Sequence, residues 1–298
     1  MLSIYERLNK GEVLAKHELA ECYSVSEKTI QRDIDDLRAY LAEEHQFERD
    51  AAVCYDRRKQ GYYLVRYERE WLTNEEVLSL AKILLESRAL NKMELKQLMD
   101  KLLLQVVPND RKIVEEIIKS EYACYVPLQH GKPLLSSLWE LSQIINAKDV
   151  ISFDYMRMDG TERNHIVNPV AIMFSEFYFY LIAFMANSSK HSPTVFRVDR
   201  IANMKRTGEK FVVPYSERFS DGEFRKRIQF MYSGELRRLT FEFSGPSIEA
   251  VLDRLPTAEI LSKANGKYVV RVETYGSGID MWIRSQGDNI RVIKEANV

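Results

Sequence analysis

The chain has 298 residues, of which 45% are hydrophobic and 29% are charged, and its formal net charge is −1 at pH 7. This length favours two or three domains, and the composition excludes long disorder and fibrous repeats. The near-zero charge excludes recognition of nucleic acid by overall basicity. A nucleic-acid surface, if present, must come from a local cluster of basic residues.

In chain order, helical patterns over residues 2–9 and 16–22 precede a longer amphipathic helix, for which Ser26 is the expected N-cap. Segments 51–56 and 61–67 then resemble two strands of a hairpin. Helix, helix, longer helix and hairpin is the order of a winged helix-turn-helix. The apolar stripe of the longer helix consists of Ile30, Ile34, Leu37 and Leu41.

The opposite face of that helix carries polar and basic side chains near its N-terminus. An α-helix fits the major groove, where arginine can bind guanine and glutamine can bind adenine. The basic tip of the hairpin can contact phosphate in a neighbouring groove. Taken singly, these groups also fit a solvated helix face and a charged turn. The predicted DNA-binding residues are Ser26, Lys28, Thr29, Gln31, Arg32, Arg57, Arg58 and Lys59.

The segment VSEKTIQRDIDDLRAYL resembles the recognition helix of DeoR-type winged helix-turn-helix regulators. Its pattern is a small polar residue, a basic residue and then Thr-Ile-x-Arg-Asp-Ile-x-x-Leu. The resemblance covers about the first 65 residues and implies binding of duplex DNA.

Residues 73–121 are expected to be helical. Thr73 and Glu76 make a capping box. We expect a long helical region over residues 77–107, which Pro108 ends, and a further helix through about Glu121. This leucine-rich part is expected to be a connector and a dimer surface.

A helix over about 134–146 leads into strand-like segments at 150–158, 165–174, 176–186 and 194–208, a spacing that favours a small barrel. After residue 235, strand-like segments at 236–245, 267–276 and 289–295 alternate with helical patterns at 246–256 and at about 278–285, an order that fits a compact α/β module.

Segment 176–186 is apolar or aromatic on both faces, so both faces are expected to be covered. Tyr180 then needs a hydrogen-bond partner for its hydroxyl, or a ligand that supplies one. Downstream, Arg197 and Arg200 are three residues apart, and a buried arginine requires a carboxylate or phosphate. Asp199 or an anionic ligand can meet that need. A purely structural aromatic core with internal ion pairs explains the same pattern.

Residues 136–214 resemble a WYL domain, a family named for a Trp-Tyr-Leu triplet that here reads Phe179-Tyr180-Leu181. An Ile-Ser-Phe-Asp-Tyr strand, the Asn168-Pro169 step and the FRVDRI segment follow the family's order. The resemblance implies an SH3-like or Sm-like β-barrel with a pocket for nucleotides or nucleic-acid fragments, and a C-terminal extension from about Tyr232. The implied ligand-binding residues are Tyr155, His165, Tyr180, Arg197 and Arg200.

The cysteines and histidines indicate no metal site. The three cysteines form no CxxC pair and are expected to be buried thiols, and the five histidines have no metal-ligand spacing. No GxSxG elbow or Gly-rich phosphate loop occurs. We therefore expect no metal, no cofactor and no enzyme activity. Without an apolar leader or a run of about 18 apolar residues, a soluble cytoplasmic protein with no membrane contact is expected.

Together these observations predict an α+β multidomain protein. Its predicted parts are a winged helix-turn-helix DNA-binding domain (1–68), a helical connector (69–133), a WYL β-barrel sensor (134–228) and a small α/β extension (229–298).

The predicted function is a homodimeric transcription regulator that binds a duplex DNA operator, a repressor rather than an activator, controlled by an anionic small ligand or oligonucleotide. Two alternatives remain. One is an RNA or single-stranded nucleic-acid binding protein that uses the barrel as its main site. The other is a nucleotide-processing enzyme.

Overall fold

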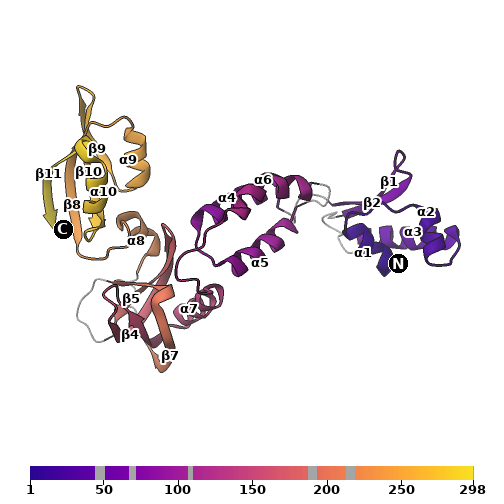
Figure 1. Cartoon of the computed structure of the whole chain (residues 1–298), viewed down its shortest axis with the longest axis horizontal. Coiled ribbons are helices and arrows are strands. Elements are labelled where there is room, and N and C mark those ends of the chain that lie inside the picture. The colour runs from indigo at the N-terminus through magenta and orange to yellow at the C-terminus, as the bar shows by residue number, and fades with distance from the viewer. Residues whose placement is uncertain (44–50, 67–71, 107–109, 187–192, 213–218, 298) are drawn as a thin grey trace. The chain divides into compact units, whose positions relative to one another are not determined.

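The computed structural model describes residues 1–43, 51–66, 72–106, 110–186, 193–212 and 219–297 (Figure 1). They form two compact units, Met1–Pro127 and Leu128–Val298. The predicted boundary between residues 68 and 69 and the predicted stop at Pro108 lie outside the described residues. In the part of the chain that is described, no helix has the length and apolar character needed to cross a membrane.

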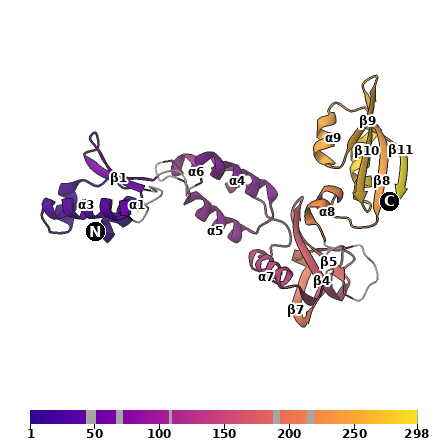
Figure 2. The same ribbon diagram turned by 180° about the vertical axis from the view of Figure 1, so that it is seen from behind.

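The N-terminal part of the first unit follows the predicted order of helices and hairpin (Figure 2). The apolar stripe of α3 is at most 5% exposed and packs against α1, α2 and the hairpin. Tyr62 exchanges backbone hydrogen bonds of 2.8 Å with Leu14, which joins the hairpin to the segment between α1 and α2. The elements are α1 (Leu2–Asn9), α2 (Lys16–Cys22), α3 (Glu27–Glu43), β1 (Ala51–Asp56) and β2 (Gly61–Arg66).

The helical part of the first unit corrects one prediction. The long helical region is two helices, α4 (Asn74–Ser87) and α5 (Lys92–Leu103), followed by α6 (Arg111–Ala123). The chain leaves α4 at Arg88 in the left-handed conformation (φ 52°), and the Asn91 side chain caps α5 by accepting from the Glu94 N–H. The capping box of Thr73 and Glu76 before α4 is confirmed.

The second unit begins with α7 and a five-stranded antiparallel sheet. The predicted strand over 194–208 is interrupted by a 3₁₀ turn, Val198–Arg200. The strand order is β6-β5-β4-β3-β7, with β6 and β7 at the edges. The elements are α7 (Leu135–Ala147), β3 (Asp149–Met156), β4 (Glu162–Ser175), β5 (Tyr178–Met185), β6 (Thr194–Arg197) and β7 (Ile201–Lys210).

This sheet is strongly curled but open. In a flat sheet, β3 and β6 would lie about 14 Å apart, at about 4.8 Å per strand. Yet the Tyr155 hydroxyl of β3 accepts a 3.1 Å hydrogen bond from the Arg197 N–H of β6, and the rings of Phe153 and Phe196 lie 5.1 Å apart. The two edge strands do not pair with each other among the described residues, so the predicted closed barrel is not formed.

Both faces of β5 are covered, as predicted. Leu181 and Ala183 pack with α7 inside the curl. Tyr180 and Ile182 lie on the other face, in a cluster with Phe224. That phenylalanine belongs to α8 (Asp221–Arg227), a helix that the sequence analysis missed.

The last module has the order β-α-β-β-α-β, and its sheet order is β11-β8-β10-β9. The predicted strands and helices are present, and β9 is an addition. Both helices share one hydrophobic core with β8 and β10. The elements are β8 (Leu236–Phe243), α9 (Ile248–Arg254), β9 (Glu259–Ala264), β10 (Lys267–Tyr275), α10 (Gly278–Ser285) and β11 (Ile290–Asn297).

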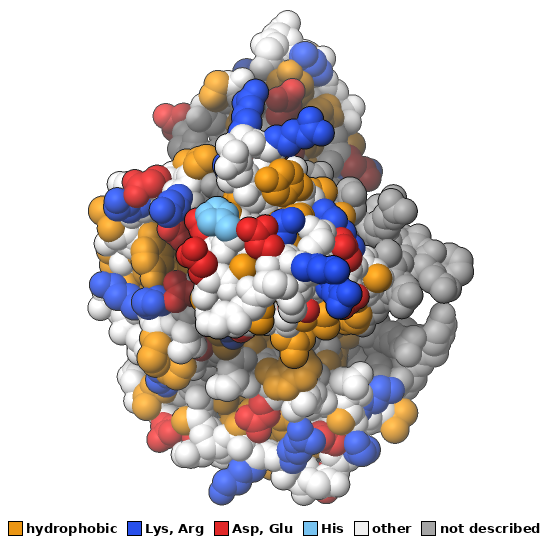
Figure 3. Space-filling model, turned by 90° about the vertical axis from the view of Figure 1, so that its right-hand side faces the viewer, with side chains coloured by type: hydrophobic (Ala, Val, Ile, Leu, Met, Phe, Trp, Pro, Cys, Tyr) orange, Lys and Arg blue, Asp and Glu red, His pale blue; other side chains and the backbone are white. Residues whose placement is uncertain are grey.

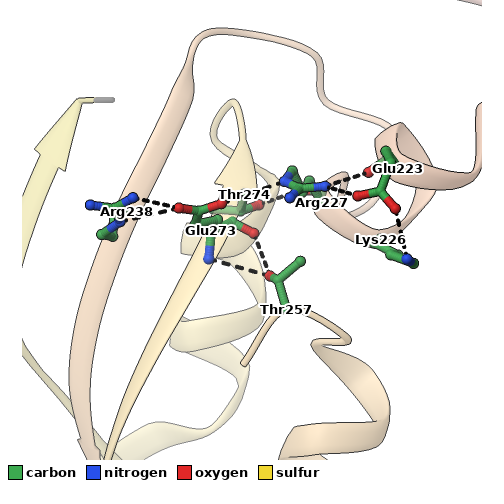
Figure 4. Close-up of polar contacts among 7 residues, drawn as sticks. All are labelled: Glu223, Lys226, Arg227, Arg238, Thr257, Glu273 and Thr274. Carbon is green, nitrogen blue, oxygen red and sulfur yellow. Dashed lines mark hydrogen bonds and ion pairs between the residues drawn. The ribbon is translucent and has the colours of Figure 1, made fainter. Parts of the chain in front are cut away.

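Helix α8 is attached to this module by a polar network (Figure 4). The Thr274 hydroxyl donates to the Arg227 carbonyl at 2.7 Å. Glu273 forms ion pairs with Arg227 at 3.6 Å and with Arg238 at 2.6 Å. Helix α8 therefore contacts the cluster around Tyr180 through its apolar side and the last module through its polar end.

Gly278 provides a test of packing in the last module. A Cβ at this position would lie 1.8 Å from the Gln229 carbonyl oxygen. We predict that Gly278→Ala lowers the free energy of unfolding by about 3 kcal/mol, measured by thermal or denaturant unfolding. Gly222→Ala in α8 is the control, since its Cβ would meet nothing within 4 Å. Equal stability of the two variants would contradict the packing described here.

Candidate functional site

The N-terminal end of α3 presents an exposed polar and basic surface. The Ser26 hydroxyl caps the helix by accepting from the Thr29 N–H at 3.2 Å, and the two hydroxyls lie 3.0 Å apart. Lys28 and Arg32 are four residues apart and therefore share one helix face. Both are exposed, and neither forms an ion pair with any residue that the structure describes. Their charges are available for a ligand.

The turn of the hairpin forms a second basic surface in the same unit. Asp56 accepts hydrogen bonds from the backbone N–H groups of Arg58 and Lys59, at 2.8 and 3.2 Å. This turn leaves the side chains of Arg57, Arg58 and Lys59 exposed.

Acidic and basic side chains are mixed on the side of the molecule seen in Figure 3. This side therefore carries no broad positive field.

Gln31 has a different environment from the other predicted DNA-binding residues. It is half-buried, and its Oε1 accepts hydrogen bonds from Lys16 at 3.2 Å and from the Tyr62 hydroxyl at 3.0 Å. Its Nε2 donates to Asp35 at 3.0 Å. Its side chain is therefore engaged within the protein.

In the second unit, Tyr180 and Arg197 are direct cross-strand neighbours on β5 and β6, so their side chains lie on the same face. Arg197 forms two hydrogen bonds to Asp199, at 3.0 and 2.8 Å. Its guanidinium carbon lies 3.4 Å from the centre of the Tyr178 ring. Tyr178 was not predicted as a site residue, although it alternates with Tyr180 along the strand.

Asp199 is only 5% exposed, so the charge of Arg197 is largely met inside the protein. Burial lowers the pKa of Arg197, but the hydrogen bonds and charge of Asp199 outweigh burial and leave the pKa raised. The arginine is a permanent cation in this pair. Burial also raises the pKa of Tyr180 to about 12, against the smaller opposing effect of Arg197. Its hydroxyl is a neutral donor near pH 7, and none of the described residues forms a hydrogen bond with it.

Tyr155 and His165 lie inside the curl, on the opposite face from Tyr180. The His165 ring centre is 6.1 Å from that of Tyr155 and 5.2 Å from that of Phe196. Burial, with Arg157 and Arg163 nearby, lowers the pKa of His165. The predicted ligand site is thus divided between two faces, and the Tyr155 hydroxyl connects them through its hydrogen bond with the Arg197 N–H.

Arg200 is the last residue of the 3₁₀ turn, and Lys132 contacts this turn from another part of the chain. Arg200 is half-buried and forms no ion pair with the residues described. The Lys132 ammonium donates to the Asp199 carbonyl oxygen at 2.7 Å. Lys132 belongs to the segment that enters α7, so this contact ties the turn to the beginning of the second unit. The sequence carried no signal for this contact, because the two residues are 67 positions apart.

A cavity of about 490 Å³ opens in the last module, beside Phe230, Trp282 and Arg254. The Arg254 guanidinium lies 4.7 Å from the centre of the Phe230 ring and pairs with Glu176 at 3.0 Å. Arg254 is the cation among the residues that line this cavity. Because Arg254 is already paired with Glu176, the lining offers no unpaired cation to an anionic ligand.

The cysteines differ from prediction. Cys22 and Cys124 are exposed and Cys54 is half-buried, so none is a fully buried thiol. Within the described ranges, no group of three or more His, Cys, Asp or Glu residues is arranged to hold a metal ion.

Comparison with known proteins identifies one domain. Residues 137–206 match the WYL domain family, from within α7 to within β7. The chain therefore contains a WYL domain. No curated protein matches the sequence.

Two solved structures resemble the chain weakly. Proteasome accessory factor B/C (PafBC) of Arthrobacter aurescens has a TM-score of 0.32 and 14% identity, over 94% of this chain and 43% of that chain. A structure titled "Crystal structure of a CRISPR Cas-related protein" has a TM-score of 0.37 and 12% identity, over 66% of this chain and 56% of that chain. This chain thus spans about half the length of these two structures.

The environment of Tyr180 predicts a pH effect on stability. The unfolded phenol ionises near pH 10, whereas the folded one stays neutral up to about 12. The stabilisation from the neutral phenol is therefore complete below about pH 10 and is lost as the pH rises toward 12. Between pH 9 and 11, wild type should lose up to about 1 kcal/mol relative to Tyr180→Phe, measured by denaturant unfolding. A constant difference between the two proteins would contradict this.

Proposed function

We propose that this protein is a DNA-binding transcription regulator whose WYL domain responds to an anionic ligand. The observation that carries the proposal is the exposed basic surface of the first unit, formed by the start of α3 and the hairpin tip, in a chain that also contains a WYL domain. Regulation, rather than catalysis, is the role proposed for both units.

The N-terminal arrangement supports duplex DNA as the partner. Three helices followed by a hairpin that pairs back to Leu14 is the order of a winged helix-turn-helix, the DeoR-type arrangement expected from the sequence. In such a domain the third helix enters the major groove and its N-terminal residues approach base edges. Lys28 and Arg32 occupy that part of α3, and Arg57, Arg58 and Lys59 are suited to phosphate contacts.

Arg200 at the 3₁₀ turn and Tyr180 on β5 each offer a group that can bind an anionic ligand. Arg200 offers a half-buried cation without an internal counter-ion among the described residues, and Tyr180 offers a neutral hydroxyl donor. Tyr178 and the stacked Arg197 add a flat surface suited to a nucleobase. A nucleotide or short oligonucleotide combines these features.

A homodimer is part of the proposal, because two copies place two recognition helices on two half-sites. Exposed apolar side chains on α4 and α6 support a dimer surface in this region: Ile83 is 67% exposed, Ile113 59% and Ile117 50%. Repression is proposed as the default effect. Sedimentation equilibrium tests the dimer.

The basic surface of α3 should determine DNA affinity. We predict that Lys28→Ala combined with Arg32→Ala weakens binding to a duplex from the protein's own promoter region by about 100-fold, since each base or phosphate contact contributes about 1–3 kcal/mol. The salt dependence should also decrease. Fluorescence anisotropy at two salt concentrations measures both effects.

The control combines Lys294→Ala with Arg284→Ala, which removes the same charge from exposed positions on β11 and α10. It should bind like wild type. Equal binding of wild type to promoter and unrelated duplex, or a preference for single strands, would contradict the proposal and favour a single-strand binding protein.

The Lys132–Asp199 contact is the proposed route from ligand to DNA. A ligand shifts a conformational equilibrium only if it binds one state better than the other. With a short 5′-phosphorylated DNA oligonucleotide as the probe, Lys132→Met should bind the probe like wild type but lose at least half of its effect on duplex affinity.

Arg200→Ala is the matched variant, since it should weaken binding of the oligonucleotide itself by about tenfold and leave duplex affinity unchanged in its absence. If Lys132→Met preserves the full effect of the oligonucleotide, the route through Lys132 is wrong.

A further inference from the structure

Gln31 lies on the proposed DNA-reading helix, yet its side chain forms hydrogen bonds with other residues of the same unit. An amide oxygen has two lone pairs, and Lys16 and Tyr62 occupy both on Gln31 Oε1, at 3.2 and 3.0 Å. One N–H of Nε2 donates a hydrogen bond to the Asp35 carboxylate at 3.0 Å. Bidentate binding of adenine requires the oxygen to accept from the base while the nitrogen donates to it. Gln31 must therefore break at least one of the two contacts to its oxygen before it can read adenine.

The partners of Gln31 connect three parts of the unit. Lys16 begins α2, Asp35 belongs to α3, and Tyr62 is the second residue of β2. The Tyr62 ring is 7% exposed and lies 5.0 Å from the ring of Tyr55 on the other strand of the hairpin. Its hydroxyl reaches α3 through Gln31 alone among the described residues. The Gln31–Tyr62 hydrogen bond therefore joins the hairpin to the helix.

Arg38 adds a second connection between the same elements. Its Nε donates to the Val53 carbonyl of β1 at 3.0 Å, and Nη1 donates to Asp35 at 3.2 Å. Its guanidinium carbon lies 5.5 Å from the centre of the Tyr62 ring. The hairpin is thus attached to α3 on one side by Gln31 and on the other by Arg38. Gly61 permits the close approach on the α1–α2 side, since a Cβ there would lie 2.6 Å from Val13 Cγ1.

From these contacts we infer that Gln31 is a positioning residue that fixes the hairpin against α3, and that it does not read a base. This inference rests on the proposed function of the unit in DNA binding. With the hairpin fixed, Lys28 and Arg32 on the helix and the basic tip of the hairpin meet DNA as one rigid surface. When the hairpin is loose, only a fraction of molecules has the binding geometry, and the apparent affinity is the intrinsic affinity multiplied by that fraction.

The test compares Gln31→Met with Tyr62→Phe, two changes of nearly constant shape that each remove one side of the same hydrogen bond. Both full-length variants should weaken binding to the promoter duplex by a similar factor, between about twofold and tenfold. Both should keep the wild-type base preference at every operator position, measured with single-base operator substitutions. The double variant should bind no more weakly than Gln31→Met, because the two residues act through one contact.

A second readout does not depend on DNA. Amide hydrogen exchange of residues 51–66 should be faster in both variants than in wild type, whereas exchange in α7 serves as the internal control. If Gln31→Met relaxes the preference at one base pair while Tyr62→Phe binds like wild type, Gln31 reads a base and the inference is wrong. Unchanged exchange in the hairpin of both variants also overturns it. If wild type itself fails to bind duplex specifically, the proposed function fails, and faster exchange still supports the positioning role.

Discussion

The second unit depends on one short connection, the 3₁₀ turn Val198–Arg200 between the two edge strands of a five-stranded sheet. The four residue-to-residue steps from Arg197 to Ile201 span at most about 14 Å, whereas edges four strand spacings apart in a flat sheet would be about 19 Å apart. The sheet must therefore curl. The curl brings Tyr155 into contact with Arg197 and buries Asp199 at the turn. The Asp199 carboxylate accepts hydrogen bonds from Arg197, and its backbone carbonyl accepts one from Lys132.

This constraint separates the two arginines that the sequence could not distinguish. The carboxylate that compensates the charge of Arg197 is that of Asp199, which is two residues further along the chain, preorganised and 5% exposed. An external anion therefore gains little by replacing it. Arg200 has no such partner among the described residues. In the proposed function, Arg200 is therefore the arginine that binds the charge of the ligand, while Arg197 stays paired with Asp199 and stacked on Tyr178. The WYL triplet position Tyr180 adds a donor on the same face.

Much of the fold was predictable because local patterns and tertiary packing agree. The apolar stripe of α3, the Thr73–Glu76 capping box and helix Gly278–Ser285 are formed as expected. The break between α4 and α5 was missed because the leucine-rich pattern continues through it, although Asn91 is a usable N-cap signal. Strand β9 was missed despite Asn265-Gly266, whose φ angles of 49° and 75° fit a type I′ hairpin turn. The division of the predicted ligand-binding residues between two faces follows from cross-strand register and curl, which no local pattern encodes.

In both units, buried or half-buried polar groups fix the geometry, while Lys28, Arg32 and Arg200 form no ion pair with the residues that the structure describes. A net charge of −1, with acids interspersed among the bases, gives little of the general phosphate attraction that holds a polybasic protein on any DNA. Binding must then come from the simultaneous engagement of a small number of groups whose spacing is set by the fold. Such a surface is sensitive to geometry, because moving one group out of register removes a large share of the total. Under the proposed function, a modest ligand-induced change in the position of these groups would be sufficient to change the occupancy of an operator.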